Sequence, residues 1–371
     1  MERLFTNKLD LETPCLILDV DIVEQNLRRM QTFAEAKGKK LRPHAKTHKC
    51  TALAKKQIEY GAIGVCAAKV SEAEKLANAG VSGILLTGPF VTAGQIHKIV
   101  EIRSTCPSFV VAVDHPAVVQ KLSDALRQQN IALDVLLDID VGLERTGVTP
   151  SNALSMAEEI LSYKNLRLRG IQAYAGHLQH IASYQERKKA SYSCFEKVIP
   201  LFTKLKKETE GCTIFSASGT GTFAIDSGIP EITEFQVGSY VCMDAEYLAI
   251  ESTERDGESQ FKPALRLLTT VVSANQKGFV TVDAGLKSLY RDGAVPQIIT
   301  PAFAGMTYDW FGDEYGKIIC GENIQAPSLG TVIELVVSHC DPTINLFDRF
   351  YLTRGDEVVD QWNVDLRGCS Q

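Results

Sequence analysis

Short apolar segments alternate with amphipathic ones over the first two thirds of the chain. The segments that read as buried strands are 41–46, 62–68, 83–87, 109–114, 133–139, 169–175, 213–217 and 234–241. Most intervals between them carry apolar residues at helical spacing, as in 72–79, 94–103, 116–129, 152–163 and 184–207. Strict alternation of strand and helix predicts right-handed crossovers and a parallel sheet, and eight such units in about 220 residues fit a (β/α)₈ barrel. An open doubly wound sheet is the alternative, and the lack of a Gly-x-Gly-x-x-Gly turn after the first strand speaks against it.

An additional strand and helix precede these units. Residues 15–20 form an apolar strand after Thr13-Pro14. We expect the next helix to begin at Asp21, because Glu24 stands three residues later as in a capping box, and to end at Gly38.

The hydrophobic pattern changes after about residue 255. The apolar segments become short and are separated by Gly, Asp and Asn turns; they are 265–273, 278–282, 331–338, 347–353 and 357–362. Arg354-Gly355-Asp356, between the last two, is typical of a hairpin. We therefore predict a barrel over 21–250 and a mainly antiparallel β domain formed by 1–20 and 251–371, in which the early strand can pair.

Composition narrows the functional classes. The chain has 371 residues, a formal net charge of −6, and 45% hydrophobic residues, which is ordinary for a globular protein. The acidic balance gives no reason to expect nucleic acid as a partner, and no apolar run approaches the roughly 20 residues of a membrane span. Met1–Asp10 lacks the apolar core of a secretory signal, and the ten cysteines are scattered singly. We expect reduced thiols and a cytoplasmic location.

The most reactive-looking stretch is 41–50. On an extended strand, Arg42, His44, Lys46 and His48 would share one face. A lysine that is crowded by cations or desolvated loses part of its preference for the charged form, so it can attack a carbonyl cofactor. The alternative is an ordinary solvated cationic loop, and the stretch itself does not decide between them.

Other polar groups follow later strands, where a barrel of this type carries its working residues. They are Arg145 after the fifth strand, Tyr174, His177 and His180 after the sixth, 218–222 after the seventh, and 238–240 within the eighth. Loops after strands 7 and 8 are the usual phosphate site of such barrels. A loop rich in Gly, Ser and Thr is by itself a weak signal, but two at these strands with a lysine on the first strand form a stronger set.

Together these stretches carry a family resemblance. The sequence resembles the fold-type III pyridoxal-phosphate enzymes, whose N-terminal domain is of the alanine racemase type. Within them it is similar to the group of D-threonine aldolases and eukaryotic-type D-serine dehydratases. The matching stretches are Thr13-Pro14, 42–49, 144–147, 218–222, 283–287 and 338–343.

The resemblance implies a cofactor site. Lys46 would carry the internal aldimine, Arg145 would face the pyridine nitrogen, and Tyr174 would line the ring. An arginine does not give up its proton, so the pyridine would stay unprotonated and act as a moderate electron sink. The remaining cofactor contacts implied are His44, Ser218, Gly219, Thr220, Gly238, Ser239 and Tyr240.

The resemblance also implies a metal site at His339 and Asp341. A His-x-Asp pair is usually ordinary surface polarity, but here it follows an apolar strand and precedes Pro342. The dehydratase branch typically has Cys at the third position, which suits zinc, whereas Asp suits Mn²⁺ or Mg²⁺. Cys340 would point away from the metal.

These residues favour an aldolase that cleaves small β-hydroxy-D-amino acids, with His180 as the base and His177 as its competitor. The alternatives are a dehydratase of D-serine or 3-hydroxy-D-aspartate, in which Lys46 removes the Cα proton, and a non-catalytic pyridoxal-phosphate-binding protein. A racemase would need a second base that no segment obviously supplies. Tyr315 stands where the related segment usually carries His, so specificity can differ. Relatives of this fold type are commonly homodimers.

Overall fold

The computed structural model describes residues 6–252, 261–321 and 324–371, and the chain separates into two compact units. The barrel unit comprises Arg29–Lys46, Leu53–Gly238 and Gly368–Gln371. The β unit comprises Met1–Arg28, Thr47–Ala52 and Ser239–Arg367. Only part of Met1–Asp10, the segment without a signal-like apolar core, lies within the described residues.

The barrel unit is built on eight parallel strands. In spatial order they are β2 (Lys40–Leu41), β9 (Glu234–Phe235), β8 (Ile214–Ala217), β7 (Leu166–Ala173), β6 (Leu133–Asp138), β5 (Val110–Val113), β4 (Leu85–Leu86) and β3 (Cys66–Ala67). A parallel bridge between His44 and Cys66 joins the two ends of this order. The predicted alternation of strands and helices in a barrel is therefore confirmed.

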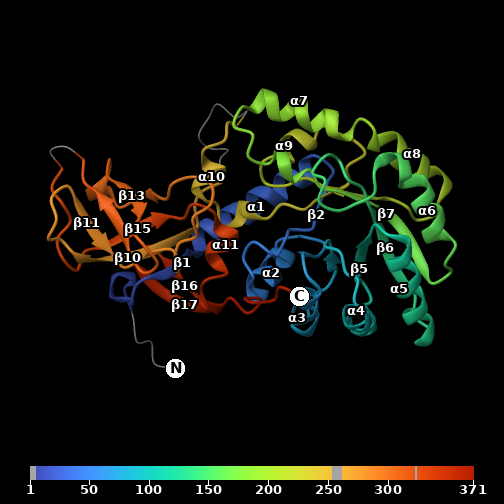
Figure 1. The fold of residues 1–371 in the computed structure, drawn as a ribbon, viewed down its shortest axis with the longest axis horizontal. Coiled ribbons are helices and arrows are strands. Elements are labelled where there is room, and N and C mark those ends of the chain that lie inside the picture. Colours follow the sequence, from blue (N-terminus) through green and yellow to red (C-terminus); the bar gives the residue numbers. More distant parts are fainter. Residues whose placement is uncertain (1–5, 253–260, 322–323) are drawn as a thin grey trace. The chain divides into compact units, whose positions relative to one another are not determined.

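Helices alternate with these strands and, in Figure 1, lie along their outer side. They are α1 (Val20–Ala36), α2 (Thr51–Glu59), α3 (Val70–Asn78), α4 (Ala93–Thr105), α5 (Pro116–Gln128), α6 (Ala153–Leu161), α7 (Tyr184–Phe195), α8 (Val198–Glu208) and α9 (Phe223–Asp226). Apolar contacts fasten them to the strands: Phe195 of α7 and Phe202 of α8 pack their rings on Phe215 of β8. All three side chains are fully buried, and each such burial stabilises the fold by about 1.5–3 kcal/mol.

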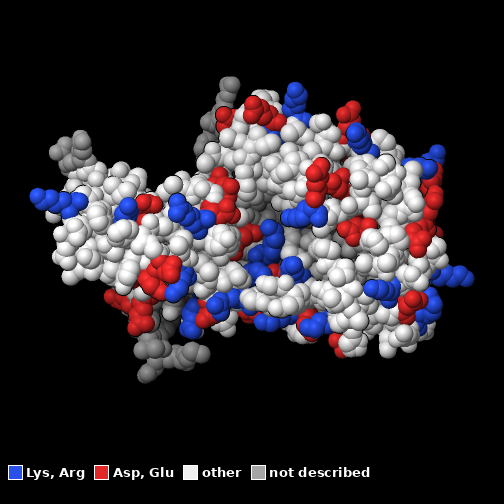
Figure 2. Space-filling view, in the orientation of Figure 1, with Lys and Arg blue, Asp and Glu red and all other residues white. Residues whose placement is uncertain are grey.

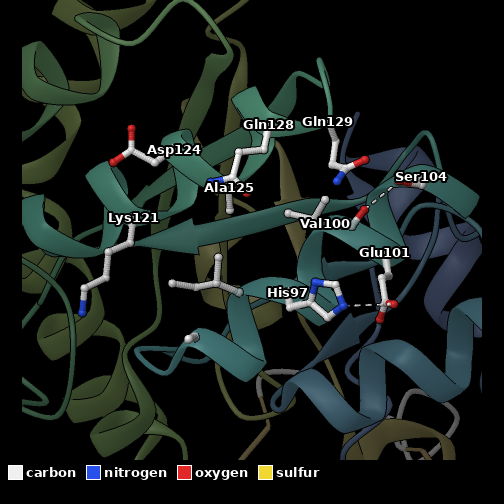
Figure 3. Close-up of a pocket in the computed structure, with 11 residues that line it drawn as sticks. His97, Val100, Glu101, Ser104, Lys121, Asp124, Ala125, Gln128 and Gln129 are labelled. Carbon is white, nitrogen blue, oxygen red and sulfur yellow. Dashed lines mark hydrogen bonds and ion pairs between the residues drawn. The ribbon is translucent and has the colours of Figure 1, made fainter.

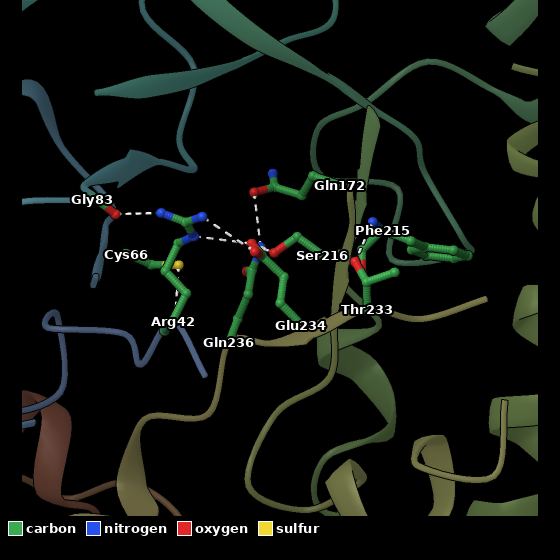
Figure 4. A network of polar contacts seen from close by, with 9 residues as sticks. All are labelled: Arg42, Cys66, Gly83, Gln172, Phe215, Ser216, Thr233, Glu234 and Gln236. Carbon is green, nitrogen blue, oxygen red and sulfur yellow. Dashed lines mark hydrogen bonds and ion pairs between the residues drawn. The ribbon is translucent and has the colours of Figure 1, made fainter. Parts of the chain in front are cut away.

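A polar network lies between the barrel strands (Figure 4). Arg42 binds Glu234 through two nitrogens, at 3.0 and 3.2 Å, and also donates to the carbonyl of Gly83. Both charged side chains are almost fully buried, and the paired geometry offsets the cost of removing them from water. The sequence pattern placed Arg42 on the same face as Lys46. In the structure Arg42 instead pairs with Glu234, so that prediction is wrong for Arg42.

The β unit is a mainly antiparallel sheet. Its main path runs β13 (Thr307–Trp310), β14 (Gly316–Ile319), β11 (Phe279–Val282), β10 (Leu265–Ser273), β1 (Cys15–Asp19), β16 (Arg349–Arg354) and β17 (Glu357–Asn363), with β15 (Val332–Val336) on β10 and β12 (Gln297–Ile298) on β15. The early strand β1 pairs here, antiparallel to β10 and parallel to β16. The expected hairpin joins β16 to β17, with Gly355 at a φ of 59°.

Several element boundaries differ from the predictions. The strand predicted over 41–46 is regular only at β2, because Pro43 has no amide donor for a ladder and the chain turns at 45–48. The helix predicted from Asp21 begins at Val20, and Asp19 caps it by accepting the Ile22 amide at 3.1 Å. The single helical segment predicted over 184–207 is two helices, α7 and α8.

The structure can be compared with three expectations from composition, which concern surface charge, membrane-spanning helices and the cysteines. Acidic and basic side chains are interspersed over both units on the face shown in Figure 2. Across the described stretches, none of the helices combines the length and apolar character needed to cross a bilayer. All ten cysteines lie in these stretches, and each is a free thiol in the structure.

Candidate active site

The barrel unit places Lys46 in a turn that follows β2, with its side chain half-buried. The Lys46 amide donates to Nδ1 of His44 at 3.3 Å, and Nε2 of His44 lies 3.1 Å from Oγ1 of Thr87. Thr87 donates its own proton to the carbonyl of Ala67 at 3.1 Å. Because Nδ1 accepts and the threonine proton is already used, Nε2 must carry the histidine proton. His44 is therefore a neutral ring that holds the backbone of Lys46.

A second group of polar side chains continues from Thr87 across the barrel. The Gln172 amide nitrogen donates to the Thr87 carbonyl and to Oδ1 of Asp138, both at 3.0 Å. The Gln172 oxygen accepts from Gln236 at 3.2 Å, and Gln236 also donates to Ser216 at 2.9 Å (Figure 4). These hydrogen bonds join the strands that carry Asp138, Gln172 and Ser216 to one another in the barrel interior.

Asp138 ends β6 and is the charged member of this network. Burial raises the pKa of its carboxyl from 3.8 to about 6, although hydrogen bonds from Gln172 and Thr146 act in the opposite direction. Thr146 donates to Oδ2 of Asp138 at 3.1 Å. Asp138 therefore connects the barrel interior to the loop that carries Arg145.

The Arg145 loop is also held at two other points. Oδ1 of Asp140 accepts the amides of Gly142 and Glu144, both at 3.0 Å. The Gly147 amide donates to Asp114 at 3.0 Å. Gly147 has a φ of 94°, and a Cβ there would lie 2.6 Å from the Asp140 nitrogen, so the loop requires glycine at this position.

Arg145 and Tyr174 are brought together, as the resemblance implied. The guanidinium carbon of Arg145 lies 6.0 Å from the centre of the Tyr174 ring, a cation–π distance. Tyr174 directly follows β7 and is half-buried, whereas Arg145 is exposed. The contact with the Tyr174 ring restricts the position of the Arg145 guanidinium, which remains exposed and accessible to a ligand.

The loop 218–222 is buried throughout and tightly packed on Gln179. Gln179 accepts the Gly221 amide at 3.0 Å and donates to Oγ1 of Thr222 at 3.2 Å. A Cβ on Gly219 would lie 2.4 Å from the Gln179 side-chain oxygen, so only glycine allows this approach. Ser218 has a φ of 72°, a conformation that non-glycine residues rarely adopt and that clusters at functional sites.

Two buried charged residues, on helices α7 and α9, hold the loop 218–222 in place. Arg187 of α7 donates to the Gly221 carbonyl at 2.8 Å and to the carbonyl of Ile181. Asp226 ends α9 and accepts from Ser191 of α7. Burial raises the pKa of Asp226, and the Ser191 hydrogen bond opposes this shift. The loop is thus fixed by α7 and α9, which the sequence pattern did not reveal.

The two candidate bases lie beyond β7 and are both exposed. Nε2 of His177 is 3.6 Å from Sγ of Cys194 in α7. The ring of His177 also lies against Gly142, where a Cβ would be 3.6 Å from Nε2. His180 follows on the other side of a short 3₁₀ turn at Gly176–Leu178.

The β unit carries the predicted metal pair. His339 follows β15 and begins the short helix α11 (Cys340–Ile344), with Asp341 in its first turn. Nε2 of His339 and Oδ2 of Asp341 are 3.8 Å apart, and the two side chains are 20% and 15% exposed. Over the residues that the structure describes, these donors are not part of a ready cluster of three or more His, Cys, Asp or Glu. A metal held here would need water or substrate to complete its coordination.

A buried carboxylate, Asp244, holds the backbone between His339 and Asp341. Asp244 precedes α10 (Ala245–Leu248) and accepts the Tyr247 amide at 3.0 Å and the Cys340 amide at 2.9 Å. Burial raises the pKa of Asp244, and these backbone amides oppose the shift. Cys340 is fully buried, and burial raises the pKa of its thiol well above the usual range. Its Sγ donates to Oδ2 of Asp341 at 3.5 Å, so the sulfur contacts the carboxylate of the pair.

Two residues predicted to bind the cofactor phosphate, Ser239 and Tyr240, lie in the β unit with the metal pair. Oγ of Ser239 donates to Oδ2 of Asp341 at 3.4 Å, a long hydrogen bond that links a predicted cofactor residue to a predicted metal residue. Tyr240 is fully buried, and its ring packs edge-on against Phe261 at 5.7 Å. Gly238 is the last residue of the barrel unit in this part of the chain.

Sequence reasoning missed most of the supporting residues. They are Thr87, Asp114, Asp138, Asp140, Gln172, Gln179, Arg187, Asp226, Asp244 and Asp292. Some carried a usable signal: Asp138 and Gln172 are polar residues at or next to the carboxyl ends of β6 and β7. Others, such as Gln179 and Asp244, meet their partners only through the fold.

A groove on the barrel unit contains none of the predicted site residues. It lies between α4 and α5 and is lined by side chains that include His97, Glu101, Lys121 and Gln128 (Figure 3). His97 and Glu101 pair across one helical turn at 3.3 Å. The groove is thus a feature of the outer helices and not of the strand ends.

Comparison with known proteins identifies similarities over the whole chain. Residues 18–246 match the family model "Alanine racemase, N-terminal domain", and residues 264–353 match the model "Putative serine dehydratase domain". The chain is 35% identical to a D-threonine aldolase from Arthrobacter sp, over 97% of this chain and 94% of that protein. It is 33% identical to a 3-hydroxy-D-aspartate aldolase from Paracoccus denitrificans (strain Pd 1222), over 97% and 93%. Among solved structures, a D-threonine aldolase from Filomicrobium marinum superposes with a TM-score of 0.94 at 34% identity, covering 100% of this chain and 99% of that one.

Proposed function

This chain belongs to the alanine racemase N-terminal domain family, and we propose that it is a D-threonine aldolase that uses pyridoxal phosphate and a divalent metal. The reaction is the retro-aldol cleavage of a β-hydroxy-D-amino acid into glycine and an aldehyde. Similarity to two aldolases over nearly the full length of each supports the carbon–carbon lyase class.

The observation that carries the choice of reaction is the pair His339 and Asp341. Its donors are an imidazole nitrogen and a carboxylate oxygen 3.8 Å apart, and the side chain of the neighbouring Cys340 is buried. A carboxylate is a harder ligand than a thiolate, so Asp341 in place of a cysteine shifts the preference from zinc toward Mn²⁺ or Mg²⁺. The pair fits the aldolase pattern of the resembling group and not the His-x-Cys pattern of its dehydratase branch.

The barrel residues fit pyridoxal phosphate. Lys46 supplies the amine that holds the cofactor, Arg145 and Tyr174 supply the partners for its ring, and the hydroxyls of 218–222 supply phosphate contacts. The neutral His44 ring fixes the backbone of Lys46, so it orients the lysine and does not compete for a proton. When bound, the cofactor supplies a sink for the electron pair that the broken bond leaves behind.

The protein groups then have separate tasks. His339 and Asp341, with the ion they bind, orient the substrate carboxylate or β-hydroxyl. A base removes the hydroxyl proton as the Cα–Cβ bond breaks, and Cα is protonated afterwards, so D-threonine gives glycine and acetaldehyde. We assign the base to His180, which lies just beyond β7, with His177 as the alternative.

The second candidate function is a dehydratase of D-serine or 3-hydroxy-D-aspartate. The match of 264–353 to the serine dehydratase domain is the observation that favours it. In that reaction Lys46 would remove the Cα proton, and an ion held by His339 and Asp341 would supply the Lewis acidity that makes the hydroxyl a leaving group. A non-catalytic cofactor-binding role is a third candidate, against which the metal pair and the extensive β unit count.

Product analysis distinguishes these candidates. The purified protein, loaded with pyridoxal phosphate and Mn²⁺, is offered D-threonine and D-serine separately, with and without a chelator. We expect glycine and acetaldehyde from D-threonine, lost on chelation. Keto acid and ammonia from D-serine would establish the dehydratase instead, and no product with cofactor bound would favour the binding protein.

A homodimer and a cytoplasmic location remain predictions from the sequence. Size measurement by light scattering of the holoenzyme checks the first, and the location of the protein in fractionated cells checks the second.

A further inference from the structure

His339 has a carboxylate partner on the side of its ring that faces away from Asp341. Nδ1 of His339 lies 3.1 Å from Oδ2 of Asp292, while Nε2 is the nitrogen nearest to Asp341. An ionised carboxylate can only accept a hydrogen bond, so Nδ1 must carry the proton. In the neutral ring, Nε2 then presents its lone pair on the Asp341 side.

We propose that Asp292 is a positioning residue for the divalent metal, because it fixes the tautomer and the ring orientation of His339. The inference rests on the metal role proposed above for His339 and Asp341. Outer partners of this kind typically change metal affinity by about 10–100-fold when they are removed.

The three residues before Asp292 are each anchored to another part of the β unit. Oγ of Ser338, the residue before His339, donates to the carbonyl of Tyr290 at 2.7 Å. The indole of Trp310 donates to the carbonyl of Leu289 at 2.7 Å, and Arg291 stacks over the same indole at 5.6 Å. Asp292 is therefore carried by backbone that is tied to the histidine segment itself, although its own side chain is 56% exposed.

Glu246 is the competing partner. Its Oε2 lies 4.0 Å from Nδ1 of His339, which is beyond hydrogen-bond distance. Gly293, at a φ of 71°, leaves room for it, since a Cβ there would lie 2.5 Å from the same oxygen. Asp292 holds the hydrogen bond, whereas Glu246 contributes negative charge at longer range.

The side chain of Asp292 is mostly exposed, and contacts of such a carboxylate contribute little to stability, so loss of Asp292 should leave the protein folded. The matched control is Asp309, another acidic residue of the β unit, which pairs with Lys317 at the same distance of 3.1 Å. Substitution of either residue removes one negative charge and one surface pair. Only Asp292 contacts the proposed metal ligand.

The test is the Mn²⁺ dissociation constant of the full-length holoenzyme, measured from the electron paramagnetic resonance signal of free Mn²⁺. We expect Asp292→Ala to raise it about 10–100-fold and Asp292→Asn to raise it less, because the amide oxygen still accepts the Nδ1 proton. Asp309→Ala should leave it unchanged. Cofactor absorbance should be the same in all of these proteins.

Two results would overturn the inference while leaving the metal site in place. One is an Asp292→Ala protein that binds Mn²⁺ within about twofold of the parent while His339→Ala binds none. The other is a larger loss from Glu246→Gln than from Asp292→Ala, which would make Glu246 the orienting group. A parent protein that binds Mn²⁺ no better than His339→Ala would instead remove the proposed metal site, and the inference with it.

Discussion

The cofactor residues in the barrel unit and the metal residues in the β unit are held in different ways. Around Lys46 and 218–222, the supports are buried side chains such as Gln172 and Gln179, which contact several strand ends and loops at once. Around His339, one support is the buried Asp244 and the other is the exposed Asp292. If the proposed assignments hold, cofactor binding depends mainly on the barrel interior and metal binding on two short loops, with the hydrogen bond from Ser239 to Asp341 as the direct link between the two sets of residues.

The largest effect is expected at Lys46. In Lys46→Ala the amine that holds the cofactor is gone, so the absorbance of the lysine-linked cofactor should be abolished. Lys55→Ala, an exposed lysine of α2, is the control and should bind as the parent does. An unchanged spectrum in Lys46→Ala would remove this lysine from the account.

Asp244→Ala should lower the stability of the protein and its affinity for Mn²⁺ without an equal loss of cofactor affinity. The change leaves the amides of Tyr247 and Cys340 without their acceptor, and each unsatisfied buried group costs about 1–3 kcal/mol. We expect the free energy of unfolding to fall by about 2–5 kcal/mol in urea titrations, with a weaker affinity for Mn²⁺. If cofactor affinity fell as much as metal affinity, the proposed independence would be wrong.

Asp138 should make the stability of the barrel unit depend on pH. Its pKa in the folded protein, about 6, is above the usual 3.8, so folding favours the neutral form. The stabilising contribution is then complete below pH 4 and is lost as the pH rises through 6, by about 3 kcal/mol in all.

Urea titrations of the parent and of Asp138→Asn between pH 4 and pH 7 check this dependence. The difference in unfolding free energy between the two should change in favour of the variant as the pH rises. A difference that stays constant over this range would show that Asp138 does not titrate there.

The smallest effect is expected at Gln179. In Gln179→Ala the amide of Gly221 loses its acceptor and Thr222 loses a donor, so the loop 218–222 should relax. We expect about a tenfold rise in the dissociation constant for pyridoxal phosphate and little change for pyridoxal, which lacks the phosphate. Gln129→Ala, in the α4–α5 groove, is the control. An equal loss for both ligands would show a general rather than a phosphate-specific role.

Periodicity predicted the barrel and the β domain because both depend on which residues are apolar. It did not predict the bounds of 41–46, where Pro43 interrupts the ladder, or the strands β12–β14, whose segments read as turns. The pairing of Arg42 with Glu234 joins residues 192 positions apart, and no local pattern contains it.

In the candidate site too, some residues could be predicted from the sequence and others could not. Lys46, Arg145, Tyr174 and the pair at 339 and 341 could be named from motifs, because their residue types at those places suit the chemistry. Asp244 and Asp292 could not, because a lone aspartate in a turn has no distinguishing pattern until the fold brings it to His339 or Cys340.

The most direct test of the account is Asp341→Ala, examined for cofactor absorbance and for D-threonine cleavage in the same preparation. We predict an absorbance equal to that of the parent and a loss of Mn²⁺-dependent acetaldehyde release larger than the roughly 10–100-fold expected for an outer partner. Cleavage that persists and is still abolished by a chelator would contradict the metal assignment, and loss of the cofactor absorbance would contradict the separation of the two sets of residues.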